Sequence, residues 1–362
     1  MTGAFSGERA VVVGLGVAGS AAARVLAEEG ADVRVTEARG DAVAPPGLLD
    51  AGVRVSTGGH EPSHLDGATL VVVSPGVPPH APVMGWARER GLPVWGELEL
   101  GARLATAPCL AVTGTNGKTT TTAMIAACLR SSGVDAVACG NIGHPFPVAA
   151  REGHGALVVE CSSFQLVTQE TFHPRVSVLL NLAPDHVDWH GSYEAYAAAK
   201  ARVYANQGEG DAHVGNRDDA NAAGVSGSAP CPTVWFTLGD PDEGEAGFVG
   251  PSLVGRWGME VALGSPARDT PALRADAAAA AAACHAFGVA PDAIRDGLAG
   301  FTPARHRGEI VAIARGVRFV DDSKATNPHA ALAAVGDARG VVLIAGGDAK
   351  GVDLSPLGSL AG

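Results

Sequence analysis

The segment Ala111-Val-Thr-Gly-Thr-Asn-Gly-Lys-Thr-Thr120 decides the fold of this chain. An apolar run at 109–112 leads into it and predicts a β-strand, and apolar residues at helical spacing over 124–129 predict a helix after it. A strand, a glycine-bearing loop and a helix in this order form a phosphate cradle, because the loop amides and the helix N-terminus face the anion. The sequence therefore predicts an ATP site in an α/β protein.

Two side chains in this loop suit phosphate chemistry. Lys118 supplies a positive charge, and the hydroxyl of Thr119 is placed to bind a magnesium ion. The common P-loop has a glycine where this chain has Val112, and an ordinary glycine turn before a helix is the alternative. An ordinary turn would not explain why a glycine, a lysine and threonines all lie at positions that suit phosphate binding. The expected ATP-binding residues are Gly114, Thr115, Asn116, Gly117, Lys118, Thr119, Thr120 and Thr121.

Composition narrows the class of protein. The 362 residues suggest two or three domains, and 46% hydrophobic with 18% charged residues is typical of globular chains. A formal charge of −12 argues against nucleic acid as a partner. No apolar run has the length of a membrane span, and the six cysteines have no paired spacing, so we expect a cytoplasmic protein without a membrane partner.

Lysine is rare in this chain. Only four of the 26 basic residues are lysines: Lys118, Lys200, Lys324 and Lys350. Where arginine supplies nearly all positive charge, a retained lysine indicates a position that a guanidinium cannot serve. Chance survival of surface lysines is the alternative.

Residues 10–37 have the pattern of a β-α-β unit. The turn Gly14-Leu-Gly-Val-Ala-Gly19 separates a strand at 10–13 from a helix at 20–29, and the next strand closes at Glu37. This is the dinucleotide fingerprint, which selects a pyrophosphate and a ribose and, taken alone, predicts a nicotinamide dehydrogenase. A further strand at 69–73 ends in the turn Ser74-Pro-Gly-Val-Pro-Pro79, at the edge where such sheets bind ligands.

Acids and histidines follow two later strands. The strand at 156–159 ends at Glu160, the usual place for a magnesium ligand, with a solvated carboxylate as the alternative. The strand at 176–180 is followed by four titratable side chains: Asp185, His186, Asp188 and His190. We interpret this group as a site, with His186 as the metal contact. Lys200 lies midway along a predicted helix at 193–204.

The remaining segments are less informative. The pattern loosens over 208–265, two helices are predicted at 271–288 and 290–299, and 301–309 has the composition of a linker. A third unit then begins with a strand at 317–320, a helix at 329–335 and a strand at 341–344. About sixty residues are fewer than an α/β domain needs to bury a sheet on both faces.

Together these motifs resemble the Mur ligases of peptidoglycan synthesis, and within that family the branch that adds D-glutamate. The markers are Gly114-Thr-Asn-Gly-Lys-Thr119, Glu160-Cys-Ser-Ser-Phe-Gln165, Asp185-His186, His306-Arg307…Glu309 and Asp322-Ser-Lys-Ala-Thr-Asn327. The resemblance implies a UDP-sugar-binding Rossmann-like domain at 1–96, a central ATPase domain with a mostly parallel sheet at 97–302, and the start of a C-terminal Rossmann-like amino-acid-binding domain at 303–362.

The resemblance implies an ATP-dependent ligase of cell-wall synthesis. ATP would phosphorylate the alanyl carboxylate of UDP-N-acetylmuramoyl-L-alanine, and the amine of D-glutamate would displace phosphate from the acyl phosphate. We expect a cytoplasmic monomer. The expected contacts to the UDP substrate are Gly14, Leu15, Gly16, Val17, Ala18, Gly19, Glu37, Arg39, Ser74, Gly76 and Asn141.

The resemblance also assigns the remaining site residues. Arg307 and Asp322 would contact ATP, and Lys324, Thr326 and Lys350 would contact D-glutamate. Two magnesium ions are implied, one on Thr119 and Glu160 and one on His186 and Lys200. Because a cationic lysine cannot bind a cation, Lys200 would be a carbamate. The catalytic residues would be Lys200, His186 and Lys324.

Two departures from the family pattern stand out. The alanine-rich helix opens with Ala272-Leu273…Asp276, where the family has His-Asn…Asn at its nucleotide site. The sequence also ends before the segment that completes the family's D-glutamate pocket, which predicts poor ligation by this chain. The alternatives are a non-catalytic nucleotide-binding relative or fragment, and a nicotinamide dehydrogenase supported by the glycine turn alone.

Overall fold

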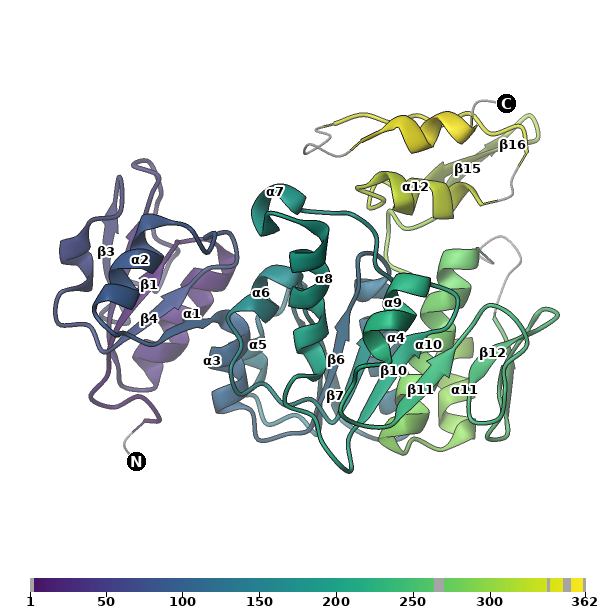
Figure 1. The fold of residues 1–362 in the computed structure, drawn as a ribbon, viewed down its shortest axis with the longest axis horizontal. Coiled ribbons are helices and arrows are strands. Elements are labelled where there is room, and N and C mark those ends of the chain that lie inside the picture. Colours follow the sequence, from purple (N-terminus) through teal and green to yellow (C-terminus); the bar gives the residue numbers. More distant parts are fainter. Residues whose placement is uncertain (1–2, 264–269, 337–338, 348–352, 361–362) are drawn as a thin grey trace. The chain divides into compact units, whose positions relative to one another are not determined.

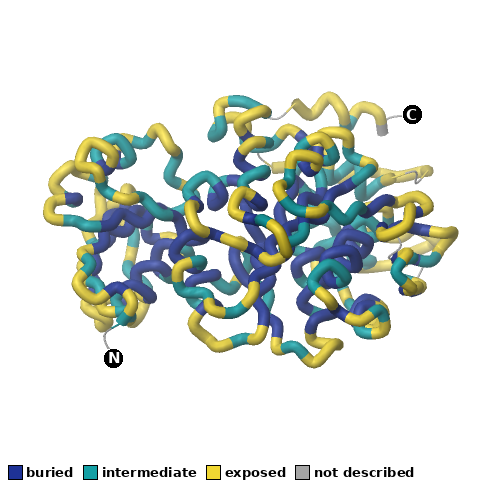
Figure 2. The backbone as a smooth tube through the Cα atoms, turned by 60° about the horizontal axis from the view of Figure 1, so that its bottom comes forward, coloured by how far each residue is buried: buried dark blue, intermediate teal, exposed yellow. Residues whose placement is uncertain are grey.

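The computed structural model describes residues 3–263, 270–336, 339–347 and 353–360 (Figure 1). It divides into two compact units: Met1–Cys109 with Val137–His173, and Leu110–Ala136 with Pro174–Gly362. The α/β class predicted from the sequence is confirmed in both units. Buried residues follow the strands and the helix faces that cover them (Figure 2).

The first unit contains a five-stranded parallel sheet. Its order is β3 (Arg54–Thr57), β2 (Asp32–Glu37), β1 (Arg9–Val13), β4 (Leu70–Val73), β5 (Val94–Gly96). The runs of valine in β1 and β4 are fully buried, as expected of strands covered by helices on both faces. The helices are α1 (Val17–Glu28), α2 (Pro82–Glu89), α3 (Glu97–Leu104) and the 3₁₀ turn η1 (Pro62–Leu65).

Glycine is required at the turn after β1. Gly14 has φ of 98°, in the left-handed region, and a Cβ there would lie 2.6 Å from the Ser74 hydroxyl. A Cβ on Gly19 would lie 2.0 Å from the Gly14 carbonyl oxygen. Gly14 and Gly19 are therefore packed closely against each other and against the side chain of Ser74, which follows β4.

The first unit also contains β7 and β8, which lie side by side. These elements and the short helices beside them are β7 (Ala136–Gly140), α5 (Phe146–Ala149), β8 (Ala156–Glu160) and α6 (Ser163–Val167). Ser162 caps α6 reciprocally with Gln165, since the Ser162 hydroxyl accepts from the Gln165 amide and the Gln165 side chain accepts from the Ser162 N–H. This capping box fixes the chain direction just after Glu160.

In the second unit the sheet runs β14-β13-β12-β11-β10-β9-β6. The strands are β6 (Cys109–Thr113), β9 (Val176–Leu179), β10 (Ala212–Asn216), β11 (Thr233–Phe236), β12 (Ala246–Val249), β13 (Ser252–Gly255) and β14 (Met259–Ala262). Pairing is parallel from β6 to β12 and antiparallel beyond it. The loose pattern at 208–265 thus ends in a small antiparallel meander.

The helices of this unit position the phosphate loop. They are α4 (Lys118–Ser131), α7 (Val187–His190), α8 (Tyr193–Ala201), η2 (Arg202–Tyr204), α9 (Ala220–Ser226), α10 (Pro271–Phe287) and α11 (Pro291–Ala299). Seven consecutive alanines in α10, 277–283, are completely buried, because small side chains let the helix approach α4 and the sheet closely. The helix predicted at 271–288 is confirmed.

The C-terminal segment contains a β-hairpin and one helix. Its elements are β15 (Glu309–Ala314), β16 (Val317–Asp321), α12 (Pro328–Val335) and η4 (Ser355–Leu360). The strand predicted at 341–344 is wrong: these four residues are exposed and form no strand, since no described strand pairs with them. The strand β15 at the end of the predicted linker was not expected, because only its pairing with β16 identifies it.

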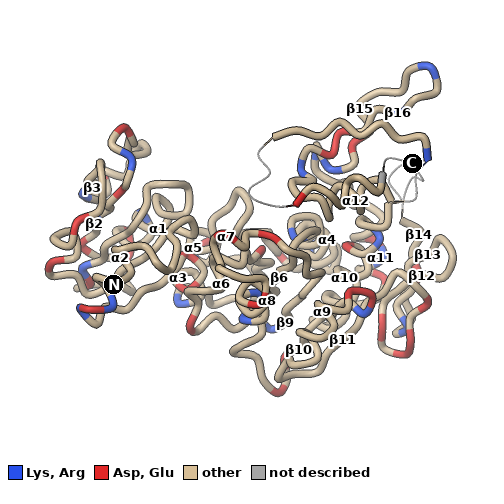
Figure 3. Tube along the Cα trace, turned by 45° about the horizontal axis from the view of Figure 1, so that its top comes forward, with Lys and Arg blue, Asp and Glu red and all other residues tan. Residues whose placement is uncertain are grey.

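Two global properties bear on the class of protein. Acidic and basic residues are interspersed along the described chain (Figure 3), with the acidic excess that gives a net charge of −12. In the described residues, no helix is both long and apolar enough to cross a membrane.

We expect the second unit to lose stability in acid, because it contains a buried histidine. His213 is fully buried, where its Nδ1 contacts the Ser177 hydroxyl at 2.7 Å and its Nε2 contacts the Ser226 hydroxyl at 2.9 Å. Burial lowers the pKa of His213 from 6.5 to about 3. The unfolded chain therefore binds a proton below pH 6.5 that the folded chain excludes, and the free energy of unfolding falls as the pH falls from 6.5 to about 3.

We expect His213→Gln to flatten this dependence by up to about 1.4 kcal/mol per pH unit. Urea unfolding of both proteins at several pH values between 4 and 7 measures the slope. The exposed His80→Gln serves as the control and should keep the wild-type slope. An equal pH dependence of the free energy of unfolding in wild type and His213→Gln would contradict the attribution of this dependence to His213.

Candidate functional site

The phosphate loop lies between β6 and α4, as the sequence predicts. Gly117 is the N-cap of α4 with φ of 85°, and no side chain among the described residues caps the helix. The first-turn N–H groups of α4 therefore lack helical partners and face the loop opening. A Cβ on Gly117 would lie 2.1 Å from Asp276 Oδ1, so only glycine fits. This arrangement is suited to an anion.

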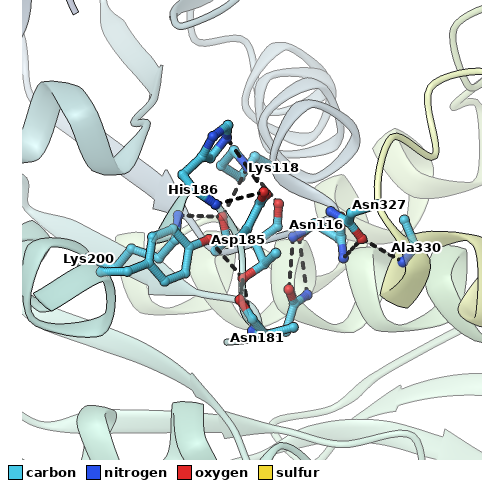
Figure 4. Close-up of polar contacts among 12 residues, drawn as sticks. Asn116, Lys118, Asn181, Asp185, His186, Lys200, Asn327 and Ala330 are labelled. Carbon is cyan, nitrogen blue, oxygen red and sulfur yellow. Dashed lines mark hydrogen bonds and ion pairs between the residues drawn. The ribbon is translucent and has the colours of Figure 1, made fainter. Parts of the chain in front are cut away.

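Two lysines converge on one backbone carbonyl of the loop. Lys118 Nζ donates to the Gly114 oxygen at 2.9 Å and to the Thr115 oxygen at 2.8 Å. Lys200 Nζ, on α8, donates to the same Gly114 oxygen at 2.7 Å (Figure 4). Lys200 is 2% exposed. Burial of a second amine beside the phosphate-loop lysine is unusual for a structural lysine and indicates a functional position.

Tyr196 and Asn181 are site residues that the sequence reasoning missed. The Tyr196 hydroxyl lies 2.9 Å from Thr115 Oγ1, and Lys200 Nζ lies 4.8 Å from the centre of the Tyr196 ring. Burial raises the pKa of Tyr196, which keeps the phenol neutral. Asn181 Oδ1 accepts the Asn116 N–H at 2.8 Å, and its Nδ2 donates to the Asn116 carbonyl at 3.1 Å. The spacing of four between Tyr196 and Lys200 on one helix was the available signal.

The segment after β9 brings three of its four titratable side chains to this site: Asp185, His186 and His190. His186 has φ of 51° and forms the N-cap of α7, which turns it back toward Asp185. Its backbone N–H donates to Asp185 Oδ1 at 3.0 Å, and its Nε2 lies 3.7 Å from Asp185 Oδ2. Burial, with Lys200 nearby, lowers the pKa of His190 to about 4. Asp188 is exposed.

Glu160 in the first unit has the features of a cation ligand. The carboxylate is 2% exposed, and its Oε1 accepts from Asn141 Nδ2 at 2.9 Å. Its Oε2 is buried without a hydrogen-bond partner among the described residues. A buried, unpartnered carboxylate oxygen is costly unless a cation binds it. The described residues contain no group of three or more His, Cys, Asp and Glu side chains placed to hold a metal.

The predicted UDP-sugar residues surround the glycine turn. Glu37 Oε2 accepts the Leu15 N–H at 2.7 Å, and its Oε1 accepts from the Arg39 N–H at 3.0 Å. Burial raises the pKa of Glu37, but these hydrogen bonds outweigh it and hold the pKa below its ordinary value. Gly16, Val17 and Gly76 are exposed, while Gly14, Ala18 and Ser74 are half-buried and Gly19 is buried.

Three of the predicted C-terminal residues lie on the loop between β16 and α12: Asp322, Lys324 and Thr326. Asp322 Oδ1 accepts the Gly308 N–H at 3.2 Å, and Arg307 acts electrostatically on Asp322. Lys324 and Thr326 are exposed. Lys350 lies outside the described residues. The helix after this loop contacts the phosphate loop through Asn116 (Figure 4).

Asp276 lies in the alanine-rich helix α10, at a position where the family resemblance implies an asparagine. Its Oδ1 accepts from the Thr121 hydroxyl at 3.3 Å, in the first turn of α4. Burial raises the pKa of Asp276 to about 8, against the opposing effects of Thr121 and Arg307. The carboxyl is therefore neutral below pH 8, and like an asparagine side chain it can then both accept and donate hydrogen bonds.

We expect Asp276→Asn to stabilise the chain at alkaline pH. The folded pKa of Asp276 lies above the unfolded value of 3.8, so wild type loses stability as the pH rises from about 4 to about 8. The slope is up to about 1.4 kcal/mol per pH unit, and asparagine removes it. Urea unfolding of both proteins at pH 5 and pH 8 measures the difference. An equal difference at the two pH values would show that Asp276 does not titrate in this range.

Comparison with known proteins identifies the architecture. Residues 8–96 match the family model of the Mur ligase MurD-like N-terminal domain, and residues 112–249 match the Mur ligase middle domain. A UDP-N-acetylmuramoylalanine–D-glutamate ligase from Frankia casuarinae is 45% identical over 98% of this chain and 77% of its own length. The ligase of the same name from Thermobifida fusca is 44% identical over 97% of this chain and 79% of its own length.

Solved structures share the fold at lower identity. The UDP-N-acetylmuramate:L-alanyl-γ-D-glutamyl-meso-diaminopimelate ligase of Neisseria meningitides has a TM-score of 0.59 at 20% identity, covering 82% of this chain and 99% of that one. The UDP-N-acetylmuramate–alanine ligase MurC of Thermotoga maritima has a TM-score of 0.56 at 20% identity, covering 90% and 78%. With curated relatives above 40% identity over nearly its whole length, the chain belongs to the Mur ligase family, in its MurD-like group.

Proposed function

We propose that this protein joins D-glutamate to the alanyl carboxylate of UDP-N-acetylmuramoyl-L-alanine and converts ATP to ADP and phosphate. Relatives that carry the name of this activity are 41–45% identical to the chain. One observation carries the proposal: two lysines, Lys118 and Lys200, meet at the Gly114 carbonyl inside an anion-binding loop. A ligase needs such a site because a carboxylate must be phosphorylated before an amine can attack it.

The loop supports the phosphoryl-transfer half of this reaction. The uncapped first turn of α4 supplies N–H donors to phosphate oxygens, and Lys118 supplies a positive charge. In the structure Lys118 Nζ donates to the Gly114 and Thr115 carbonyls of its own loop. ATP would exchange these neutral acceptors for anionic ones, which form stronger hydrogen bonds.

We propose carboxylate, hydroxyl and imidazole groups of this chain as magnesium ligands. Glu160 offers a buried carboxylate oxygen that has no other partner among the described residues. In the second unit we propose Thr119, His186 and Lys200 as ligands, in the two-ion arrangement that the family resemblance implies. Magnesium would neutralise charge on the phosphates during transfer.

We propose that Lys200 acts as a carbamate. Two ammonium groups on one carbonyl oxygen repel each other, and the repulsion is strong at a site with little solvent. The neutral Lys200 amine attacks CO₂ and loses a proton, which replaces this like-charge pair with an attractive one. The anion then has oxygens for a cation that an ammonium cannot bind. Arginine does not undergo this reaction readily, which accounts for a retained lysine.

The remaining assignments follow the expected domain division of 1–96, 97–302 and 303–362. The glycine turn of the first unit, with Glu37 and Arg39, would hold the UDP portion of the substrate, and Asn141 would contact it near Glu160. Lys324, Thr326 and Lys350 would hold D-glutamate, with Lys324 near the reacting groups. We expect the enzyme to act in the cytoplasm as a monomer.

Ligand binding and product analysis test this function. Calorimetric titration should show binding of UDP-N-acetylmuramoyl-L-alanine and no binding of NAD. With ATP and magnesium, any ligated product that mass spectrometry detects should contain D-glutamate and not L-glutamate. Binding of NAD alone would favour a dehydrogenase, and a product formed only with another amino acid would reassign the acceptor.

A further inference from the structure

The phosphate loop is joined to the C-terminal segment by a pair of amide hydrogen bonds. Asn327 Nδ2 donates to Asn116 Oδ1 at 3.0 Å, and Asn116 Nδ2 lies 3.4 Å from Asn327 Oδ1 (Figure 4). Asn116 Nδ2 also lies 2.9 Å from Nδ1 of His329. Because an amide NH₂ only donates, His329 Nδ1 accepts, which places the ring proton on Nε2.

The backbone of Asn116 is already satisfied by Asn181. Its N–H donates to Asn181 Oδ1 at 2.8 Å, and its carbonyl accepts from Asn181 Nδ2 at 3.1 Å. These bonds fix the loop at this residue and aim its side chain at α12. The Asn116 side chain therefore contacts the C-terminal segment, although Asn116 lies in the middle of the phosphate-binding motif.

Asn327 has two separable roles. Its Oδ1 accepts the Ala330 N–H at 2.8 Å and caps α12, and its Nδ2 contacts Asn116. The loop that ends at Asn327 carries Lys324 and Thr326, three and one residues upstream of it in the chain. A displacement of Asn116 would therefore act directly on the start of α12 and on the loop that precedes it.

We propose that the Asn116–Asn327 amide pair is a latch that couples occupation of the phosphate loop to the position of the segment bearing Lys324 and Thr326. This proposal rests on the proposed function and makes Asn116, Asn327 and His329 positioning residues. A neutral amide pair is directional in both partners, so it fixes register without adding charge beside the phosphates. Two neutral hydrogen bonds are also weak enough to open in each reaction cycle.

Asn327→Asp retains the helix cap and removes one of the two bonds of the latch, the one that Asn327 Nδ2 donates. Aspartate is an equally good N-cap, so the bond from the Ala330 N–H is retained. The variant loses the donor to Asn116 Oδ1 and places a carboxylate oxygen against it. Asn327→Ser also preserves a capping oxygen but is too short to reach Asn116, and it controls for the added charge.

Hydrogen exchange of α12, measured with and without the non-hydrolysable ATP analogue AMP-PNP and magnesium, tests the latch. In wild type we expect the analogue to slow exchange of the 329–335 backbone amides at least about threefold. In Asn327→Asp and Asn327→Ser this response should disappear, with the melting temperature of the free protein unchanged within about 2 °C. Asn116→Ala should abolish the response as well, and combining it with Asn327→Ser should cause no further loss.

The outcomes separate the latch from the function. If calorimetry shows that the analogue binds wild type but exchange in α12 does not change, the latch is wrong and the ligase function stands. An equal response in wild type and both Asn327 variants would also mean that the latch is wrong and that the ligase function stands. If the analogue does not bind wild type at all, the proposed function fails, and the latch fails with it.

Discussion

Replacing Lys200 with alanine is expected to lower ATP-dependent activation of the alanyl carboxylate at least about a thousandfold, while the Kd for ATP changes less than about threefold. Lys200 Nζ is 2.7 Å from the Gly114 carbonyl and almost fully buried, yet the phosphates would be held mainly by Lys118 and the α4 amides. The loss should therefore appear in turnover and not in nucleotide binding.

The measurement is the rate of ADP formation with saturating ATP, magnesium and UDP-N-acetylmuramoyl-L-alanine, with nucleotide binding followed separately by calorimetry. Lys200→Arg is the charge-preserving control and should be as inactive as alanine, because arginine does not form the carbamate. Tyr196→Phe keeps the ring 4.8 Å from the amine and should retain most of the activity. Wild-type turnover by Lys200→Ala or Lys200→Arg would remove Lys200 from the mechanism.

Replacing Lys118 with alanine is expected to weaken ATP binding and to lower the ADP-forming rate by about a hundredfold to a thousandfold. Lys118 is the first residue of α4 and holds two carbonyls of its own loop at 2.8 and 2.9 Å. The variant loses both the charge on the phosphates and this closure of the loop. Unlike Lys200→Ala, it should show the defect in nucleotide affinity.

Arg130→Ala is the matched control for Lys118→Ala, since Arg130 lies in the last turn of the same helix and donates to the Ala136 carbonyl at 3.0 Å. It should bind ATP as wild type does. Calorimetric titration with AMP-PNP and magnesium provides the comparison. Equal affinity in Lys118→Ala and Arg130→Ala would mean that the loop does not bind the nucleotide phosphates.

Much of this architecture was predictable because local patterns and long-range packing agree. The buried valine runs of β1 and β4, the glycine turn between β1 and α1, and the alanine-rich α10 each follow from residue type and spacing. The phosphate loop was predictable for the same reason, since glycine is the one residue that fits Gly117 against Asp276. The scarcity of lysine predicts functional roles for Lys118 and Lys200, whose amines share the Gly114 carbonyl.

Other features depended on partners that are distant in the sequence. The strand β15 exists through its pairing with β16, whereas the apolar residues 341–344 have no described partner strand and form no strand. The contact of Asn116 with Asn327 joins residues 211 positions apart. Asn181 and Tyr196 carry no motif of their own, and their role follows only from the bonds that they make to the phosphate loop.

Hydroxylamine trapping tests directly whether ATP phosphorylates the alanyl carboxylate in this site. If ATP phosphorylates the alanyl carboxylate in this site, hydroxylamine will displace phosphate from the acyl phosphate and leave a stable hydroxamate. We expect wild type to form this hydroxamate together with ADP, and only when ATP, magnesium and UDP-N-acetylmuramoyl-L-alanine are all present. We expect Lys200→Ala to form almost none. Binding of both substrates by wild type with no hydroxamate, or equal hydroxamate from Lys200→Ala, would contradict this mechanism.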